Sequence, residues 1–142
     1  MSAEPSLPAP SPAPRFGVWL IGARGSVATT AVAGCAAVAA GLHPPTGMVT
    51  ETAPFAASGL PTLSSLVFGG HDTVDCPLPK RAEHLAAGGV LPHGLPSAVH
   101  AELAAADREI KPGGPLPGRD DGRTQDELID RFATDIRAFV RA

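Results

Sequence analysis

An unbroken run of apolar and small residues covers Phe16–Ile21, which is the pattern of a buried strand in a parallel sheet. A glycine-containing turn interrupts this run at Gly22–Ser26. The alanine-rich segment that follows predicts a helix over Val27–Ala40, with Ser26 as its N-cap and Gly41 as its left-handed stop. Strand, glycine turn and helix in this order predict the beginning of an α/β sheet.

Prolines and glycines divide the rest of the chain into short elements. Apolar and β-branched runs predict strands, and longer mixed segments that end at glycine or proline predict helices. The predicted elements are strands over Gly47–Glu51 and Leu63–Phe68, helices over Lys80–Ala87 and Ser97–Ile110, a loop over 111–122 and a final helix that begins after Thr124.

The final helix has the clearest local signals. Thr124 and Glu127 have the spacing of a capping box, in which each side chain binds the other residue's free backbone N–H. One face of the helix is apolar, and we expect the sheet to cover it. No strand follows this helix in the sequence, so we expect an open sheet edge and a weakly docked helix. The apolar stripe consists of Leu128, Ile129, Phe132, Ile136, Phe139 and Val140.

Composition separates a lead segment from the body of the chain. Residues 1–15 contain five prolines and almost no bulky apolar side chain, so we expect them to be disordered. Their acidic start is unlike a signal peptide, and Arg24 together with the glycine turn argues against a membrane-spanning helix over residues 16–42. The net charge of −3 argues against a nucleic-acid partner. These features favour a cytoplasmic protein without a membrane or nucleic-acid partner.

The glycine turn is a variant of the dinucleotide fingerprint G-x-G-x-x-G. Gly22 would form the tight turn, Gly25 would admit a pyrophosphate, and Ala28 would keep the helix close to the sheet. Arg24 would either supply charge to a phosphate or lie in solvent. Glu51 follows at the distance where an acidic residue accepts hydrogen bonds from the adenosine ribose of NAD. The alternative is a packing turn with a surface glutamate.

A second candidate segment is His71-Asp72, preceded by Gly69-Gly70 at the predicted end of a strand. It is either a loop held near a ligand or a solvent-exposed turn whose aspartate binds its own backbone. Neither Cys35 and Cys76 nor the other histidines have the spacing of metal ligands, so no metal site is predicted. The candidate NAD-binding residues are Gly22, Ala23, Arg24, Gly25, Ser26, Glu51 and Asp72, and no catalytic residue is predicted.

Two of these motifs together resemble the beginning of the myo-inositol-1-phosphate synthase (inositol-3-phosphate synthase) family. The family has a G-x-G-G-x-x-G-type loop after its first strand and a G-G-W-D-like segment later, similar to residues 18–26 and 68–72 here. Residues 58–62 resemble the family's G-S-L-T stretch, and residues 126–140 are similar to the helix that precedes its next Rossmann strand. In this chain Arg24 replaces a loop glycine, Ala28 the last glycine, and His71 the tryptophan.

The resemblance implies an NAD-dependent isomerase that converts glucose 6-phosphate into 1D-myo-inositol 3-phosphate in inositol and phospholipid biosynthesis. NAD, a phosphosugar substrate and a homo-oligomer are the implied cofactor and partners. Family members have several hundred residues, and their catalytic lysines lie in a second domain. Lys80 and Lys111 are the only lysines of this chain, and neither lies in a matching motif.

We therefore expect an incomplete, Rossmann-like, doubly wound parallel sheet of the α/β class over residues 16–142, after the Pro/Ala-rich disordered lead 1–15. The corresponding function is the N-terminal NAD-binding part of a synthase-like protein, inactive by itself as a fragment. The alternatives are a small non-catalytic nucleotide-binding module and a structural piece that completes its sheet against another chain.

Overall fold

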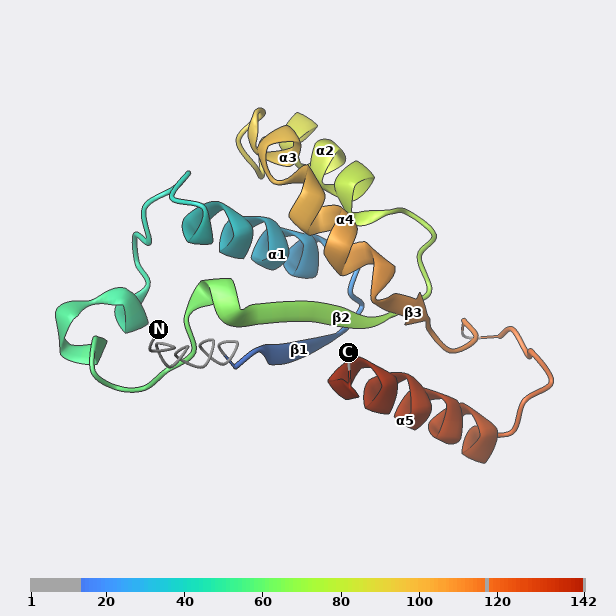
Figure 1. Ribbon diagram of the computed structural model, residues 1–142. Coiled ribbons are helices and arrows are strands. Elements are labelled where there is room, and N and C mark those ends of the chain that lie inside the picture. The colour runs from blue at the N-terminus through green and yellow to red at the C-terminus, as the bar shows by residue number, and fades with distance from the viewer. Residues whose placement is uncertain (1–13, 117, 142) are drawn as a thin grey trace, which may run out of the picture.

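A computed structural model describes residues 14–116 and 118–141, so the expected disorder of the lead lies outside the described residues except at Pro14 and Arg15. The chain forms an open three-stranded sheet in which all strands are parallel (Figure 1). The sheet and its helices agree with the expected Rossmann-like α/β class. In sheet order the strands are β1 (Phe16–Ile21), β2 (Leu66–Asp72) and β3 (Ile110–Pro112).

Helices cover both faces of the sheet, but very unequally. Helices α1 to α4 lie together over one face, and α5 lies alone against the other (Figure 1). The α-helices are α1 (Ser26–Ala39), α2 (Leu78–Ala87), α3 (Leu95–Ala98), α4 (His100–Arg108) and α5 (Gln125–Arg141). Three short 3-10 helices, η1 (Val49–Glu51), η2 (Ala53–Phe55) and η3 (Leu63–Ser65), lie between α1 and β2.

The hydrophobic core lies between the four-helix layer and the sheet. It contains many alanines, whose small side chains allow α1, α2 and α4 to approach one another closely. Leu78 and Leu103 are the largest apolar side chains that are fully buried. Phe68 and Leu20 extend this core from the sheet. The predicted alanine-rich helix is therefore central to the fold, and it begins at Ser26 with Gly25, rather than Ser26, as its N-cap.

The predicted strand Gly47–Glu51 is wrong, because this segment forms η1 and an exposed turn. A strand requires a neighbour, and β2 pairs directly with β1 from Phe16↔Leu66 to Ile21↔His71. The β-branched residues of the segment favour a strand, but a strand forms only where it pairs with a neighbour, and this segment pairs with none of the three strands.

The strand predicted over Leu63–Phe68 exists, but it lies three residues further along, over Leu66–Asp72. Gly69 and Gly70 are therefore inside β2 and do not form a loop beyond it. A Cβ at Gly69 would lie 2.8 Å from the Phe139 ring on one face of the sheet. A Cβ at Gly70 would lie 2.7 Å from Ala23 Cβ on the other face. Close packing on both faces therefore explains the paired glycines.

The helix predicted over Ser97–Ile110 is interrupted at Val99, which separates α3 from α4. Val99 is buried, and its backbone leaves the helical region with φ −114° and ψ 25°. Ile110 begins β3 instead of ending a helix, so the predicted loop over 111–122 is wrong at its first two residues. The helix predicted over Lys80–Ala87 is confirmed and begins two residues earlier.

The capping box of α5 is confirmed. Thr124 N–H donates to Glu127 Oε2 at 2.7 Å, and Glu127 N–H donates to Thr124 Oγ1 at 3.3 Å. The hydrogen bonds from Thr124 hold the pKa of the Glu127 carboxyl below its usual range. Because this pKa is lowered on folding, the contribution of the cap is complete above the ordinary pKa of a glutamate and is lost as the pH falls.

The apolar stripe of α5 is only partly covered by the sheet. Phe139 contacts the Trp19 ring, at a centroid distance of 5.1 Å, and lies over Gly17 and Gly69. None of the residues of α5 is fully buried. Those that remain exposed are Ile129, Ile136 and Val140.

The close packing at Gly70 gives a first testable outcome. We expect Gly70→Ala to lower the free energy of unfolding by about 2 kcal/mol or more, because the added methyl overlaps Ala23 and the Leu20 carbonyl. Gly34→Ala is the matched control, because a Cβ there meets nothing within 4 Å and should stabilise α1 by about 0.5–1 kcal/mol. Urea unfolding measures both changes. Equal effects of the two substitutions would show that β1 and β2 are not tightly packed at Gly70.

Candidate functional site

The glycine turn lies at the carboxyl end of β1 and is tied to the carboxyl end of β2. Gly22 N–H and Ala23 N–H both donate to the His71 carbonyl, at 2.9 and 3.2 Å. Gly22 has φ +77°, a left-handed conformation that favours glycine. Gly25 N–H then donates to the Gly22 carbonyl at 2.9 Å, which closes the turn. The predicted tight turn at Gly22 is confirmed by this geometry.

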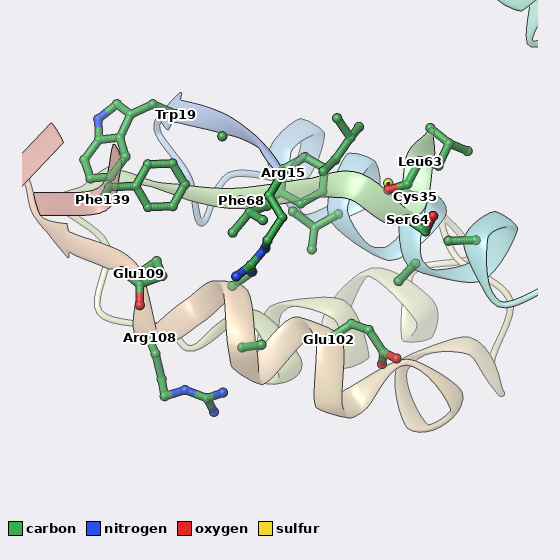
Figure 2. Close-up of a pocket in the computed structure, with 18 of the residues that line it drawn as sticks. Arg15, Trp19, Cys35, Leu63, Ser64, Phe68, Glu102, Arg108, Glu109 and Phe139 are labelled. Atoms are coloured by element: carbon green, nitrogen blue, oxygen red, sulfur yellow. The ribbon is translucent and has the colours of Figure 1, made fainter. Parts of the chain in front are cut away.

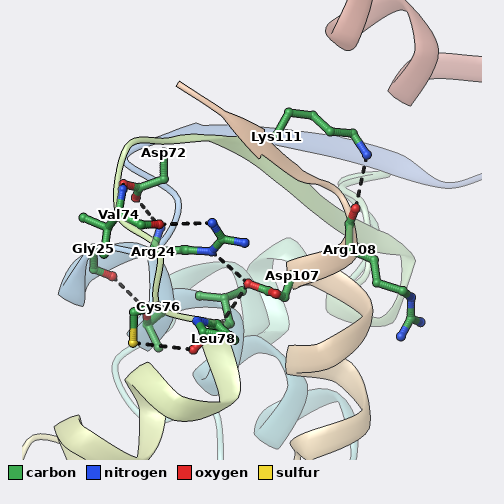
Figure 3. A network of polar contacts seen from close by, with 11 residues as sticks. Arg24, Gly25, Asp72, Val74, Cys76, Leu78, Asp107, Arg108 and Lys111 are labelled. Atoms are coloured by element: carbon green, nitrogen blue, oxygen red, sulfur yellow. Dashed lines mark hydrogen bonds and ion pairs between the residues drawn. The ribbon is translucent and has the colours of Figure 1, made fainter. Parts of the chain in front are cut away.

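The Asp72 carboxylate is the second attachment of the turn to β2 (Figure 3). Its Oδ2 accepts Arg24 N–H at 2.6 Å, and its Oδ1 accepts Val74 N–H at 2.7 Å. His71 and Asp72 are 5% and 9% exposed, so the pair is not a solvent-exposed turn, although Asp72 does bind its own following backbone. Asp72 therefore holds the glycine turn in place.

The Arg24 side chain takes neither of its two expected positions. Its Nε donates to Asp107 Oδ1 at 3.0 Å, and its Nη1 donates to the Val74 carbonyl at 3.1 Å (Figure 3). The same Asp107 oxygen accepts Leu78 N–H at 3.0 Å at the start of α2. The Arg24 and Asp107 side chains are 16% and 20% exposed, so this ion pair is largely sheltered from water.

Asp107 is a structural partner that sequence reasoning missed. It lies 83 residues after Arg24 in the sequence, inside a segment recognised only as helical. No spacing rule connects the two residues, because the contact depends on how α4 packs beside the turn. The charge of Arg24 is thus neutralised within the fold.

The N-terminus of α1 is not capped by a side chain. Gly25, its N-cap, has an extended backbone, and no side chain caps the helix. The first turn contains no acidic residue, and Ser26 and Val27 are exposed. The free N–H groups of this turn and the helix dipole favour an anion. Ala28 is buried and keeps the helix close to the sheet, as predicted.

This geometry fits a dinucleotide pyrophosphate. A Cβ at Gly22 would meet nothing within 4 Å, so the turn faces open space there. A Cβ at Gly25 would lie only 3.0 Å from the Gly22 carbonyl, which favours glycine at this position also. Ala23 is completely buried and can offer a ligand no side-chain contact. Gly22, Gly25 and Ser26 are therefore the turn residues that remain available.

Glu51 is not brought to the turn. The strand on which its predicted ribose contact depended is absent, and Glu51 is exposed in η1. The segment Val49–Phe55 follows the carboxyl end of α1, at the end of the molecule where β1 and β2 begin (Figure 1). The glycine turn is at the other end of α1, about 20 Å away for a helix of this length.

His71 belongs to the docking of α5. Trp19 Nε1–H donates to His71 Nδ1 at 3.3 Å, so Nδ1 acts as an acceptor and the proton resides on Nε2. His71 Nε2 donates to Asp135 Oδ2 at 2.9 Å, and the imidazole lies 4.5 Å from the Phe132 ring centroid. The imidazole therefore connects the sheet to α5 on the face opposite α1.

A cavity of about 930 Å³ lies elsewhere, along the amino-terminal half of β2 (Figure 2). Residues of α1, α4 and α5 form its largely apolar walls, with Phe68 and Phe139 among them. Burial raises the pKa of the Cys35 thiol in one wall, so the thiol stays protonated at neutral pH. Ligands of doubly wound sheets bind at the carboxyl ends of strands, so this cavity is distinct from the site at the glycine turn.

The described ranges 14–116 and 118–141 contain neither a cluster of metal-ligating side chains nor a membrane-spanning helix. No three histidine, cysteine or acidic side chains come together there as a potential metal site. None of the helices in these ranges combines the length and apolar character needed to cross a bilayer.

Comparison with known proteins identifies the region around the glycine turn. A family model described as myo-inositol-1-phosphate synthase, which represents an NAD-binding domain, matches residues 16–112, more than half of the chain. This range includes the whole sheet, and NAD is the cofactor of the matched domain. Among curated proteins, none matches this chain.

The double acceptor role of Asp72 leads to a second testable outcome. Asp72→Ala should lower the free energy of unfolding by about 1–3 kcal/mol, because it leaves two sheltered backbone N–H groups without a partner. Asp120→Ala is the control, since Asp120 accepts Gly122 N–H in an exposed loop and should matter by less than about 0.5 kcal/mol. Denaturant unfolding compares them. A loss at Asp72 no larger than at Asp120 would contradict its role in holding the turn.

Proposed function

Because this chain belongs to the myo-inositol-1-phosphate synthase family, we propose that its glycine turn holds NAD for the synthase reaction of that family. The observation that carries the proposal is the open N-terminus of α1, which lies at the carboxyl edge of the sheet inside the matched region. We place the pyrophosphate over Gly22, Gly25 and Ser26. The helix N–H groups would bind it, and the glycines would let it approach the backbone.

The residues around the turn have supporting roles in this proposal. Asp72 and the His71 carbonyl fix the backbone of the turn before any ligand arrives. Asp107 holds the Arg24 side chain away from the open end of α1. Preorganisation of this kind lowers the conformational cost of binding, because little of the site must rearrange.

The reaction that we propose for the complete enzyme is the conversion of glucose 6-phosphate into 1D-myo-inositol 3-phosphate. When bound, NAD would supply a hydride acceptor that returns the hydride within the same cycle, so the overall reaction is redox-neutral. The substrate is then a phosphosugar, as the family suggests. This chain contributes the cofactor-binding turn to that reaction.

We also propose that this chain does not catalyse the reaction alone. The family resemblance implies lysines that stabilise an enolate and the phosphate, and neither Lys80 nor Lys111 fits this role. Lys80 Nζ contacts Glu83 at 3.2 Å on the surface of α2. Lys111 Nζ donates to the Arg108 carbonyl at 3.1 Å and is thereby turned toward the end of α4.

The position of α5 supports the idea that the chain is part of a larger NAD-binding unit. The connections from β1 through β2 to β3 use one face of the sheet, whereas α5 lies on the other. A right-handed crossover on this second face leads back toward the outer edge of β1. Within the described residues β1 is paired on one side only. We propose that a further parallel strand covers this edge, which would form the switch point beside the glycine turn.

NAD binding is the direct test of the site. NAD at millimolar concentration should raise the melting temperature of the wild-type chain. Gly25→Val should abolish this rise, because a branched side chain would occupy the pyrophosphate position. Ser26→Asp should weaken binding about tenfold or more by charge repulsion, while the stability without ligand is kept because an acidic residue suits a helix N-terminus.

Ser58→Asp is the control for Ser26→Asp, since it adds the same charge in the exposed segment between α1 and β2. It should leave the response to NAD unchanged. A wild-type chain that shows no response to NAD, or a Ser26→Asp variant that responds fully, would contradict the proposed site.

The proposed inactivity of the isolated chain has its own test. Purified chain incubated with glucose 6-phosphate and NAD should form no inositol phosphate, because the enolate-stabilising lysines have no counterpart here. Phosphate-ester products are measured by ³¹P NMR, with a heat-denatured sample as the background. Synthase activity that co-elutes with the chain in a final size-exclusion step would overturn this part of the proposal.

A further inference from the structure

A second arginine lies at the open end of α1. Arg81 belongs to α2, which packs against α1 in the hydrophobic core. Its Nη2 donates to Ser26 Oγ at 2.9 Å, across 55 positions of sequence. Ser26 is the first residue of α1. Helix packing therefore brings a guanidinium to the helix end at which the pyrophosphate is proposed to bind.

The hydrogen-bonding capacity of Arg81 is largely unused. A guanidinium has five N–H donors, and the contact with Ser26 uses one of them. The Nε of Arg81 is buried and has no hydrogen-bond partner among the described residues. No carboxylate in the described parts of the chain forms an ion pair with it. Arg81 thus keeps a full positive charge beside the open helix N-terminus.

The charge of Arg24, by contrast, is paired within the fold. Its guanidinium is bound by Asp107 and by the Val74 carbonyl, although it is the arginine inside the glycine turn. A phosphate at the end of α1 would have to compete with Asp107 for Arg24, but not for Arg81. Arg81 is therefore the cation that the fold leaves available at this position.

We propose that Arg81 binds the pyrophosphate of NAD at the N-terminus of α1, the role that the sequence suggests for Arg24. This inference rests on the proposed NAD site and names the side chain that supplies its positive charge. The planar guanidinium suits phosphate oxygens, because it can donate two N–H groups to them at once. Ser26 Oγ accepts one N–H of Arg81 and keeps its own O–H available to donate to a phosphate oxygen.

A purely structural role for Arg81 makes a different prediction. If Arg81 only fastened α2 to α1, replacing Arg81 would lower the free energy of unfolding without changing the preference for phosphorylated ligands. We expect the opposite: because the contact with Ser26 is exposed, losing this contact should have little effect on folding. Affinity for ligands with and without a pyrophosphate, measured on the same folded variants, separates the two roles.

The experiment titrates NAD, ADP and adenosine into the full chain by isothermal calorimetry. Arg81→Gln should weaken the binding of NAD and ADP about tenfold or more, because a charge-assisted hydrogen bond to phosphate is lost. The binding of adenosine should stay within about twofold, because adenosine has no phosphate for the lost charge to contact. Arg81→Lys keeps the charge without the planar fork, so its NAD affinity should lie between those of wild type and Arg81→Gln.

Lys80→Gln is the matched control, because it removes the same charge from the neighbouring position of α2. Lys80 pairs with Glu83 on the surface, and its loss should leave the affinity for NAD unchanged. Circular dichroism melts without ligand check that Arg81→Gln and Lys80→Gln fold equally well.

Three results would overturn the inference. If Arg81→Gln binds NAD as tightly as wild type, Arg81 does not contact the pyrophosphate, although the NAD site itself stands. Equal weakening by Arg81→Gln and Lys80→Gln would show a general charge effect. A wild-type chain that binds none of the three ligands would remove the proposed function and, with it, the role of Arg81.

Discussion

The contact between the end of β1 and Gly70 of β2 is the constraint on which the rest of the structure depends. Ala23 and the Leu20 carbonyl occupy the space that a side chain at position 70 would take. This close approach lets Gly22 and Ala23 hydrogen-bond the His71 carbonyl and lets Asp72 reach the backbone of the turn. The start of α1 follows directly from this anchored turn, so the packing of two strands determines where the helix N-terminus points.

The charges around the turn differ in whether the fold itself neutralises them. Arg24 and Asp107 neutralise each other in a sheltered position, where an uncompensated charge would be costly. The same Asp107 oxygen binds the first N–H of α2, so this pair joins the turn to both α2 and α4. The end of α1, by contrast, has no acidic residue and no cap. The Arg24–Asp107 pair is thus used within the fold, whereas the partial positive charge at the N-terminus of α1 is not compensated by a side-chain cap or an acidic residue of the first turn.

The two faces of the sheet differ in how completely they are covered. One face has a continuous core of alanines and leucines beneath four helices. Among the described residues, α5 alone covers the other face. It is held by the Phe139 contact, by the His71–Asp135 bond and by two hydrogen bonds from Arg131 to the carbonyls at the end of β3, those of Pro112 and Gly113. Apolar side chains of α5 remain exposed, which suits a helix that lies beside an unpaired sheet edge. This asymmetry is compatible with an incomplete Rossmann-like sheet.

Local signals in the sequence determined β1, the tight turn at Gly22, α1 and the capped start of α5, because each depends on residues close together in the chain. Tertiary structure decided the rest. Residues 47–51 favour a strand by composition, but a strand also requires a partner, and this segment forms η1 and a turn without pairing with the sheet. The partners of Arg24 and Arg81 lie 83 and 55 residues away, and only the packing of α4 and α2 brings them together. Arg24 has a carboxylate partner, and Arg81 has none among the described residues. This difference is a property of the fold, and residue spacing along the chain could not predict it.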